Sequence, residues 1–136
     1  MRIEQFRLHD LAAYPLVHFV GDTTVAGYAT RWCEEMDQLL AGSQPFVLIY
    51  PPGERDEAHQ DRVIRGGWLK RNKARLADIC LALIVIEPDA ARRADLEAMF
   101  PNLVKAFGTP QAARGSASEA EALARHLLEG GGLETA

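Results

Sequence analysis

The turn formed by Gly21, Asp22, Thr23 and Thr24 has the residue types of a small anion-binding site. It lies between a predicted strand (residues 16–20) and a predicted helix, and a helix N-terminus offers free N–H groups and the positive end of a dipole. The turn is therefore a candidate site for an anionic nucleotide, flavin or lipid. Two observations favour a simpler role. Either threonine can cap the helix, and the chain has neither a Gly-x-Gly-x-x-Gly nor a Walker motif.

A second candidate surface joins an acidic loop to a basic helix. Six lysine or arginine residues fall between positions 62 and 75 with no acidic residue among them, in a chain whose net charge is −4. This run is either a solvated helix face or a docking surface that attracts an acidic partner. The loop before it (residues 53–61) carries four carboxylates. We predict that a protein partner binds here, through Glu54, Asp56, Glu57, His59, Arg62, Arg65, Arg71 and Arg75.

Side chains for catalysis or metal binding are sparse. His59 lies near Asp56 and Asp61, which can orient an imidazole for proton transfer, but no nucleophile stands at a matching spacing. Cys33 and Cys80 form no ligand pattern, and both are predicted to be buried. We therefore assign no catalytic residue, no metal site and no cofactor.

Composition argues for a single domain, and two cysteines are too few for a disulfide scaffold, which predicts a reducing compartment. The chain has 136 residues, which suits one domain. The negative net charge disfavours general nucleic-acid binding, which needs a basic surface. We expect no secretory signal and no membrane span, because the longest apolar run covers only residues 81–86. These features predict a cytoplasmic protein and leave homo-oligomerisation open.

Hydrophobic periodicity divides the chain into alternating strands and helices. We predict strands over residues 3–9, 16–20, 46–50, 81–86 and 103–107, the third and fourth being central because they are continuously apolar. Helices are predicted from Thr23 or Thr24 to Gly42, and over residues 61–79, 89–100 and 118–128. The last of these helices begins at a capping box, Ser118 with Glu121.

The predicted fold is one α/β domain over residues 1–129 with a flexible tail over residues 130–136. The order is ββαβαβαβα, which favours a mostly parallel central sheet with right-handed crossovers and helices packed on it. The first two strands add an antiparallel hairpin at one edge.

This order of elements resembles the STAS, or SpoIIAA-like, domains of bacterial anti-sigma-factor antagonists and transporters. The segment 68–72 (Trp-Leu-Lys-Arg-Asn), which leads into the strand 81–86, is similar to that of stand-alone members. The resemblance implies a regulatory binding module rather than an enzyme. It also implies a phosphoacceptor Ser or Thr after a central strand, but this chain has no Ser or Thr between Ser43 and Thr109. A switch operated by phosphorylation at that loop is therefore not expected.

Overall fold

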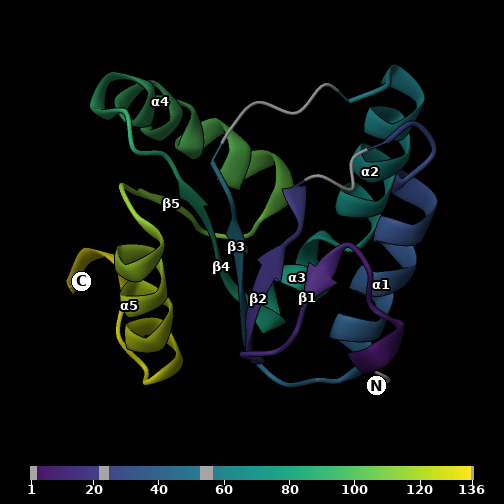
Figure 1. Ribbon diagram of the computed structural model, residues 1–136, viewed down its shortest axis with the longest axis horizontal. Helices are drawn as coiled ribbons and strands as arrows, with labels where there is room; N and C mark the ends of the chain where they lie inside the picture. The colour runs from purple at the N-terminus through teal and green to yellow at the C-terminus, as the bar shows by residue number, and fades with distance from the viewer. Residues whose placement is uncertain (1–2, 22–24, 53–56, 136) are drawn as a thin grey trace.

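The computed structural model describes residues 3–21, 25–52 and 57–135, which form a five-stranded sheet with helices on both faces (Figure 1). The strands lie in the order β1-β2-β3-β4-β5. β1 is antiparallel to β2 and the other pairs are parallel, so the predicted fold class is confirmed. The strands are β1 (His9–Asp10), β2 (Leu16–Phe19), β3 (Phe46–Tyr50), β4 (Cys80–Ile86) and β5 (Gln111–Arg114). The helices are α1 (Ala29–Ala41), α2 (His59–Arg71), α3 (Lys73–Ile79), α4 (Ala90–Phe107) and α5 (Ala117–Leu128).

Two apolar cores lie on opposite faces of the sheet. On one face α1, α2 and α3 cover the core around Met36, Phe46 and Leu48. On the other face α5 covers the core around Ile49 and Ile84. Figure 1 shows the sheet between these two layers. A strand covered on both faces must be apolar throughout, which is the reason for the continuous runs in β3 and β4.

The two central strands were predicted correctly. β3 and β4 are parallel neighbours, with Leu48 opposite Leu83 and Ile49 opposite Ile84. Ile84 is fully buried.

The predicted strand over residues 3–9 is wrong for most of its length. Residues Ile3–Gln5 form a short 3-10 helix, and β1 contains only two residues. The backbone N–H groups of Arg7, Leu8 and His9 donate to the carboxylate of Glu35 on α1, at 2.9–3.2 Å. They therefore bond to a helix side chain rather than to a neighbouring strand.

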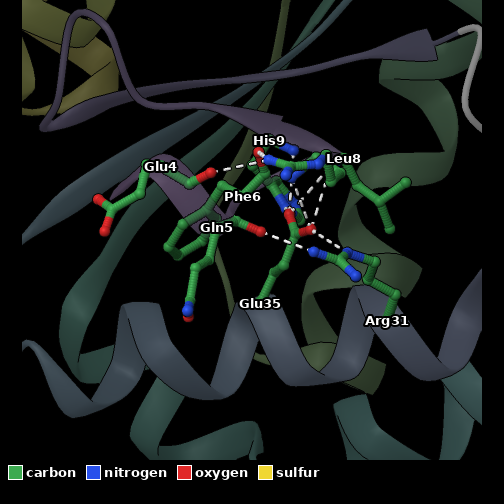
Figure 2. Close-up of polar contacts among 8 residues, drawn as sticks. Glu4, Gln5, Phe6, Leu8, His9, Arg31 and Glu35 are labelled. Carbon is green, nitrogen blue, oxygen red and sulfur yellow. Dashed lines mark hydrogen bonds and ion pairs between the residues drawn. The ribbon is translucent and has the colours of Figure 1, made fainter. Parts of the chain in front are cut away.

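Glu35 joins the N-terminal segment to α1 through further contacts (Figure 2). Its carboxylate lies 2.8 Å from Nδ1 of His9 and 3.2 Å from Nε of Arg31. Arg31 in turn donates to the carbonyl oxygen of Gln5. Burial alone would raise the pKa of Glu35, but the hydrogen bonds from His9 and from the backbone of Arg7 and Leu8 outweigh it and hold the pKa below its usual range.

The segment after β4 also differs from the prediction. α4 continues through Pro101 to Phe107, so the predicted helix end at residue 100 and the predicted strand 103–107 are wrong. Phe100, Leu103, Val104 and Phe107 have the i, i+3, i+4, i+7 spacing of one helix face. Packing of that face against the domain compensates for the hydrogen bond that a proline cannot make.

The last strand and the last helix both begin at positions other than those predicted. β5 comprises residues Gln111–Arg114, which lack the branched and aromatic residues typical of strands. The N-cap of α5 is Ser116, which accepts from the N–H of Glu119, rather than Ser118. Beyond α5, Leu133 packs against the core on that side of the sheet, within the predicted tail.

The first two predicted helices have different bounds. α1 begins at Ala29, with Tyr28 as N-cap, rather than after Thr23 or Thr24. The predicted helix over residues 61–79 begins earlier, at His59, and is divided at Asn72 into α2 and α3.

Candidate ligand-binding site

An open cavity of about 570 Å³ lies at the carboxyl ends of β2 and β3, between α2 and α4. We call it the outer cavity; it is lined by Phe19, Tyr28, Trp32, Tyr50, Glu57, Arg65, Leu96 and Met99. Ligands of open α/β sheets commonly bind outside the carboxyl ends of the strands. α4 covers this region only partly: Phe100 is its one buried residue, and Met99 is 52% exposed.

Aromatic side chains form much of the outer cavity. Phe19 and Tyr50 are the last residues of adjacent parallel strands, and their rings stack 4.7 Å apart with an interplanar angle of 9°. Trp32 on α1 meets Trp68 edge to face. Such walls suit a flat, apolar ligand, because π-faces pack well against planar groups.

An ion pair supplies the polar part of the cavity. Arg65 donates to both carboxylate oxygens of Glu57, at 2.6 and 2.8 Å, and the hydroxyl of Tyr28 donates to the same carboxylate. Nε of Arg62 lies 3.8 Å from it. The Arg65 guanidinium also lies over the Trp32 ring, 5.5 Å from the centroid. A bidentate pair of this kind holds the guanidinium in one orientation.

These groups keep their ordinary charges around neutral pH. The hydrogen bonds from Arg65 are the main cause that lowers the pKa of Glu57, and they outweigh its burial. Burial, with the hydrogen bond to Glu57, raises the pKa of Tyr28 well above its usual value. Burial lowers the pKa of Arg65, but the hydrogen bond to Glu57 outweighs it and the net shift is upward. The cluster therefore holds a fixed charge rather than exchanging protons.

Asp61 holds α2 against the start of α1. Its buried carboxylate accepts from the backbone N–H groups of Gly27 and Ala29, at 2.9 and 3.1 Å. It thus provides the side-chain cap that Tyr28 does not give α1. This contact fixes Tyr28, the N-cap of α1, and Trp32, on α1, relative to Arg65 on α2.

A narrow slot of about 60 Å³ lies beside the outer cavity, between the helices and the sheet. Trp32, Tyr50 and Arg65 line both spaces. We call this second space the inner slot; its remaining lining is Met36, Leu48, Leu69, Leu76, Leu83, Phe107, Thr109 and Gln111. Leu83 and Gln111 are partners across β4 and β5.

The structure brings two of the predicted partner-binding residues together in the outer cavity, namely Glu57 and Arg65. Arg65 was expected on an exposed face, either solvated or docking a partner, yet its side chain is only 27% exposed, because it packs on Trp32 and pairs with Glu57. Four others, His59, Arg62, Arg71 and Arg75, are exposed. Glu54 and Asp56 lie outside the described residues.

Part of the basic run has a structural role. Lys73 donates to the carbonyl oxygen of Lys105 near the end of α4. Arg75 donates to the carbonyl oxygen of Leu40 and to Ser43, at the end of α1. Cations suit helix C-termini, where carbonyl groups lack partners. The charge bias of the sequence therefore arises in part from helix ends.

The predicted anion site at the first turn receives no structural support. Gly21 follows β2, and Asp22, Thr23 and Thr24 lie outside the described residues. Since α1 begins at Ala29, the turn is not the helix N-terminus. The N–H of Ala29 also donates to Asp61, so an anion at that terminus would face a buried carboxylate.

The two cysteines differ in exposure. Cys80 is fully buried, as predicted, and burial raises the pKa of its thiol to about 12. Cys33 is only partly buried, contrary to prediction, although burial is again the main cause that raises its pKa. Both thiols are therefore protonated at neutral pH and poorly nucleophilic.

Sequence reasoning missed most of the apolar lining of the outer cavity. Trp32 was assigned to core packing, and Leu96 and Met99 are apolar helix residues with no motif that marks a site. Aromatic residues ending two adjacent strands, Phe19 and Tyr50, are the signal that points to this place.

Among residues 3–21, 25–52 and 57–135, histidine, cysteine and acidic side chains do not gather in a group that can hold a metal ion. No helix within these ranges is long and apolar enough to cross a membrane. No protein-family model, curated protein or solved structure matches the chain.

Proposed function

We propose that this protein binds a small, flat, mainly apolar molecule with one negatively charged group in the outer cavity. The observation that carries the proposal is the combination of aromatic walls with the Glu57–Arg65 pair in one cavity at the carboxyl edge of the sheet. The cavity volume lies within the range of about 300–1,000 Å³ usual for small-molecule sites.

The charge around Glu57 favours an anionic group on the ligand. One carboxylate faces two guanidinium groups, those of Arg65 and Arg62, so these three groups together carry an excess positive charge. Partial exposure leaves Arg65 accessible to a further hydrogen-bond acceptor, and a guanidinium suits a carboxylate.

The fixed protonation states favour binding over acid–base catalysis. Glu57, with a lowered pKa, stays ionised, and Tyr28, with a raised pKa, stays protonated. A general acid or base works best with a pKa near the operating pH. We therefore propose a binding module, whose ligand is held rather than transformed.

A fluorescent probe of matching chemistry tests this proposal. The probe 8-anilinonaphthalene-1-sulfonate carries two ring systems and one anionic group, and its emission rises in apolar surroundings. We expect saturable binding with one site per chain. In a nitrogen–proton correlation spectrum, the shifted amides should include Tyr28, Glu57 and Met99.

Two matched variants locate the probe. Met99 lines the outer cavity and Val63 does not, yet both are exposed apolar residues on helices, at 52% and 55%. Met99→Asp should weaken binding of the sulfonate by about tenfold, an effect of about 1.4 kcal/mol, because it adds a like charge at the rim. Val63→Asp should leave it unchanged. Equal effects of the two variants, or binding of many probes per chain, would contradict the proposal.

A protein partner is a second candidate function. Arg62, Lys70 and Arg71 are exposed, and α2 also exposes Val63. Exposed cations around an apolar residue suit an acidic partner surface. If such a partner exists, Lys70→Glu with Arg71→Glu should slow its association in kinetic measurements, and an unchanged rate would exclude this surface. The relation to STAS domains also stays a proposal, supported by the order of strands and helices.

A further inference from the structure

Two residues that line the inner slot, Trp32 and Thr109, each carry a buried polar atom without a partner. Trp32 is 2% exposed and Thr109 is 4% exposed. Neither Nε1 of Trp32 nor Oγ1 of Thr109 has a hydrogen-bond partner among the described residues. A buried polar group without a partner destabilises the folded state. Two such residues beside one slot are candidates to bind a polar atom supplied from outside the chain.

The backbone around Thr109 fixes the position of this side chain. Gly108 has φ of +85°, a conformation that suits glycine, and it ends α4. A Cβ at this position would lie 3.0 Å from Cγ of Lys73, so the turn packs closely on α3. On the other side, the carbonyl oxygen of Pro110 accepts from the N–H of Leu83. Thr109 is therefore held between two anchored residues.

The remaining lining of the inner slot is mostly apolar. Leucine side chains from α2, α3, β3 and β4 surround it. Arg65 lines both the slot and the outer cavity. A molecule whose anionic group lies at Arg65 is therefore next to the apolar lining of the slot.

We infer that the ligand inserts an apolar end bearing a hydroxyl group into the inner slot, where that hydroxyl pairs with Trp32 and Thr109. This inference rests on the proposed function and names the ligand class as a hydroxylated aromatic or similarly flat carboxylic acid. The indole N–H is a donor only, whereas a hydroxyl group both donates and accepts. One ligand hydroxyl can therefore accept from Trp32 and donate to Thr109.

Matched pairs of small acids test the inference. The probes are phenylacetate, 3-phenylpropionate and 4-phenylbutyrate, each compared with its 4-hydroxyphenyl counterpart by nitrogen–proton correlation titration. For at least one chain length the hydroxylated acid should bind about tenfold more tightly to the wild-type protein, because a site built for a hydroxyl discriminates against its absence.

Two variants at one position attribute this preference to Thr109. Thr109→Val is close in shape and removes the hydroxyl, so it should abolish the preference. Thr109→Ser keeps the hydroxyl and should retain it. Without ligand, Thr109→Val should unfold at the same urea concentration as the wild type or at a higher one, because the lost hydroxyl had no partner.

The possible failures are distinguishable. Equal binding of both acids in every pair would overturn the hydroxyl inference and leave the proposed function standing. Absence of binding by all six acids and by the sulfonate probe would overturn both. A lower unfolding midpoint of unliganded Thr109→Val would show that ordered water already satisfies the hydroxyl, which also overturns the inference.

Discussion

Replacing Glu35 by glutamine should destabilise the domain by about 3 kcal/mol. The carboxylate is buried and accepts from the backbone of Arg7, Leu8 and His9, as well as from the side chains of His9 and Arg31. Glutamine keeps the shape but turns an NH₂ group toward donors, so at least one N–H loses its acceptor. An orphaned buried donor costs about 1–3 kcal/mol, and loss of the ion pair with the half-exposed Arg31 adds up to about 1 kcal/mol.

Urea denaturation followed by tryptophan fluorescence measures this loss, since Trp32 and Trp68 are both buried. The matched control is Glu34→Gln, at the exposed neighbouring position, which should change stability by no more than about 0.5 kcal/mol. Native-state amide exchange should also accelerate at residues 7–9 in the Glu35 variant. If the two variants have the same urea midpoint, Glu35 does not hold the N-terminal segment as argued.

The same carboxylate should contribute to acid sensitivity. Because the folded-state pKa of Glu35 is lowered, its stabilisation is complete above the unfolded-state pKa and is lost as pH falls through the folded-state value. The wild-type protein should therefore lose more stability than Glu35→Gln when pH falls from 7 to 3. Parallel pH profiles of the two proteins would contradict this linkage.

Three further substitutions test the fold. Ile84→Ala should cost about 2–5 kcal/mol in urea denaturation, because it empties space in the fully buried core under α5; an unchanged midpoint would refute the packing of β4. Gly108→Ala should cost about 1–2 kcal/mol, because an L-residue at φ +85° is strained and its Cβ crowds Lys73; unchanged thermal stability would show that the turn relaxes. Asp61→Asn should cost about 1–3 kcal/mol and expose the amides of Gly27 and Ala29 to exchange; unchanged exchange would show that the cap is dispensable.

The central strands were predictable because a strand buried on both faces is apolar at every position, and this run can be recognised from its own residues. β3 and β4 are apolar throughout, and flanking prolines mark Phe46–Tyr50 as a short buried unit. The crossover helices then follow from the spacing between the strands. The fold class was therefore predictable from the pattern of apolar residues within each segment.

The elements that were mispredicted are those determined by distant residues. Residues 7–9 have strand-like alternation, yet Glu35, 26–28 positions away, accepts their N–H groups. Pro101 signals a helix end, yet packing of the following turns carries α4 to Phe107. β5 has weak strand propensity and forms because β4 offers an unpaired edge. Tertiary contacts override local preference in each case.

The candidate site was predictable only in its charged part. Glu57 and Arg65 were identified because they belong to an acidic loop and a basic run that are visible in the sequence. Trp32 and Tyr50 could not be distinguished from residues that fill the core. Convergence of α1, α2, α4 and two strand ends on one cavity depends on the three-dimensional arrangement. Apolar residues that line a site and apolar residues that fill a core are of the same types.

The basic run shows how charge counted along a sequence overstates charge free for a partner. Arg65 neutralises a carboxylate inside the cavity, while Lys73 and Arg75 bond to carbonyl groups near helix ends. Reversing Arg65 would place a second carboxylate against Glu57 and damage the fold as well as any interface. A loss of partner binding in such a variant would therefore say nothing about docking. Only Lys70 and Arg71, exposed and without an intramolecular contact described above, separate the two effects.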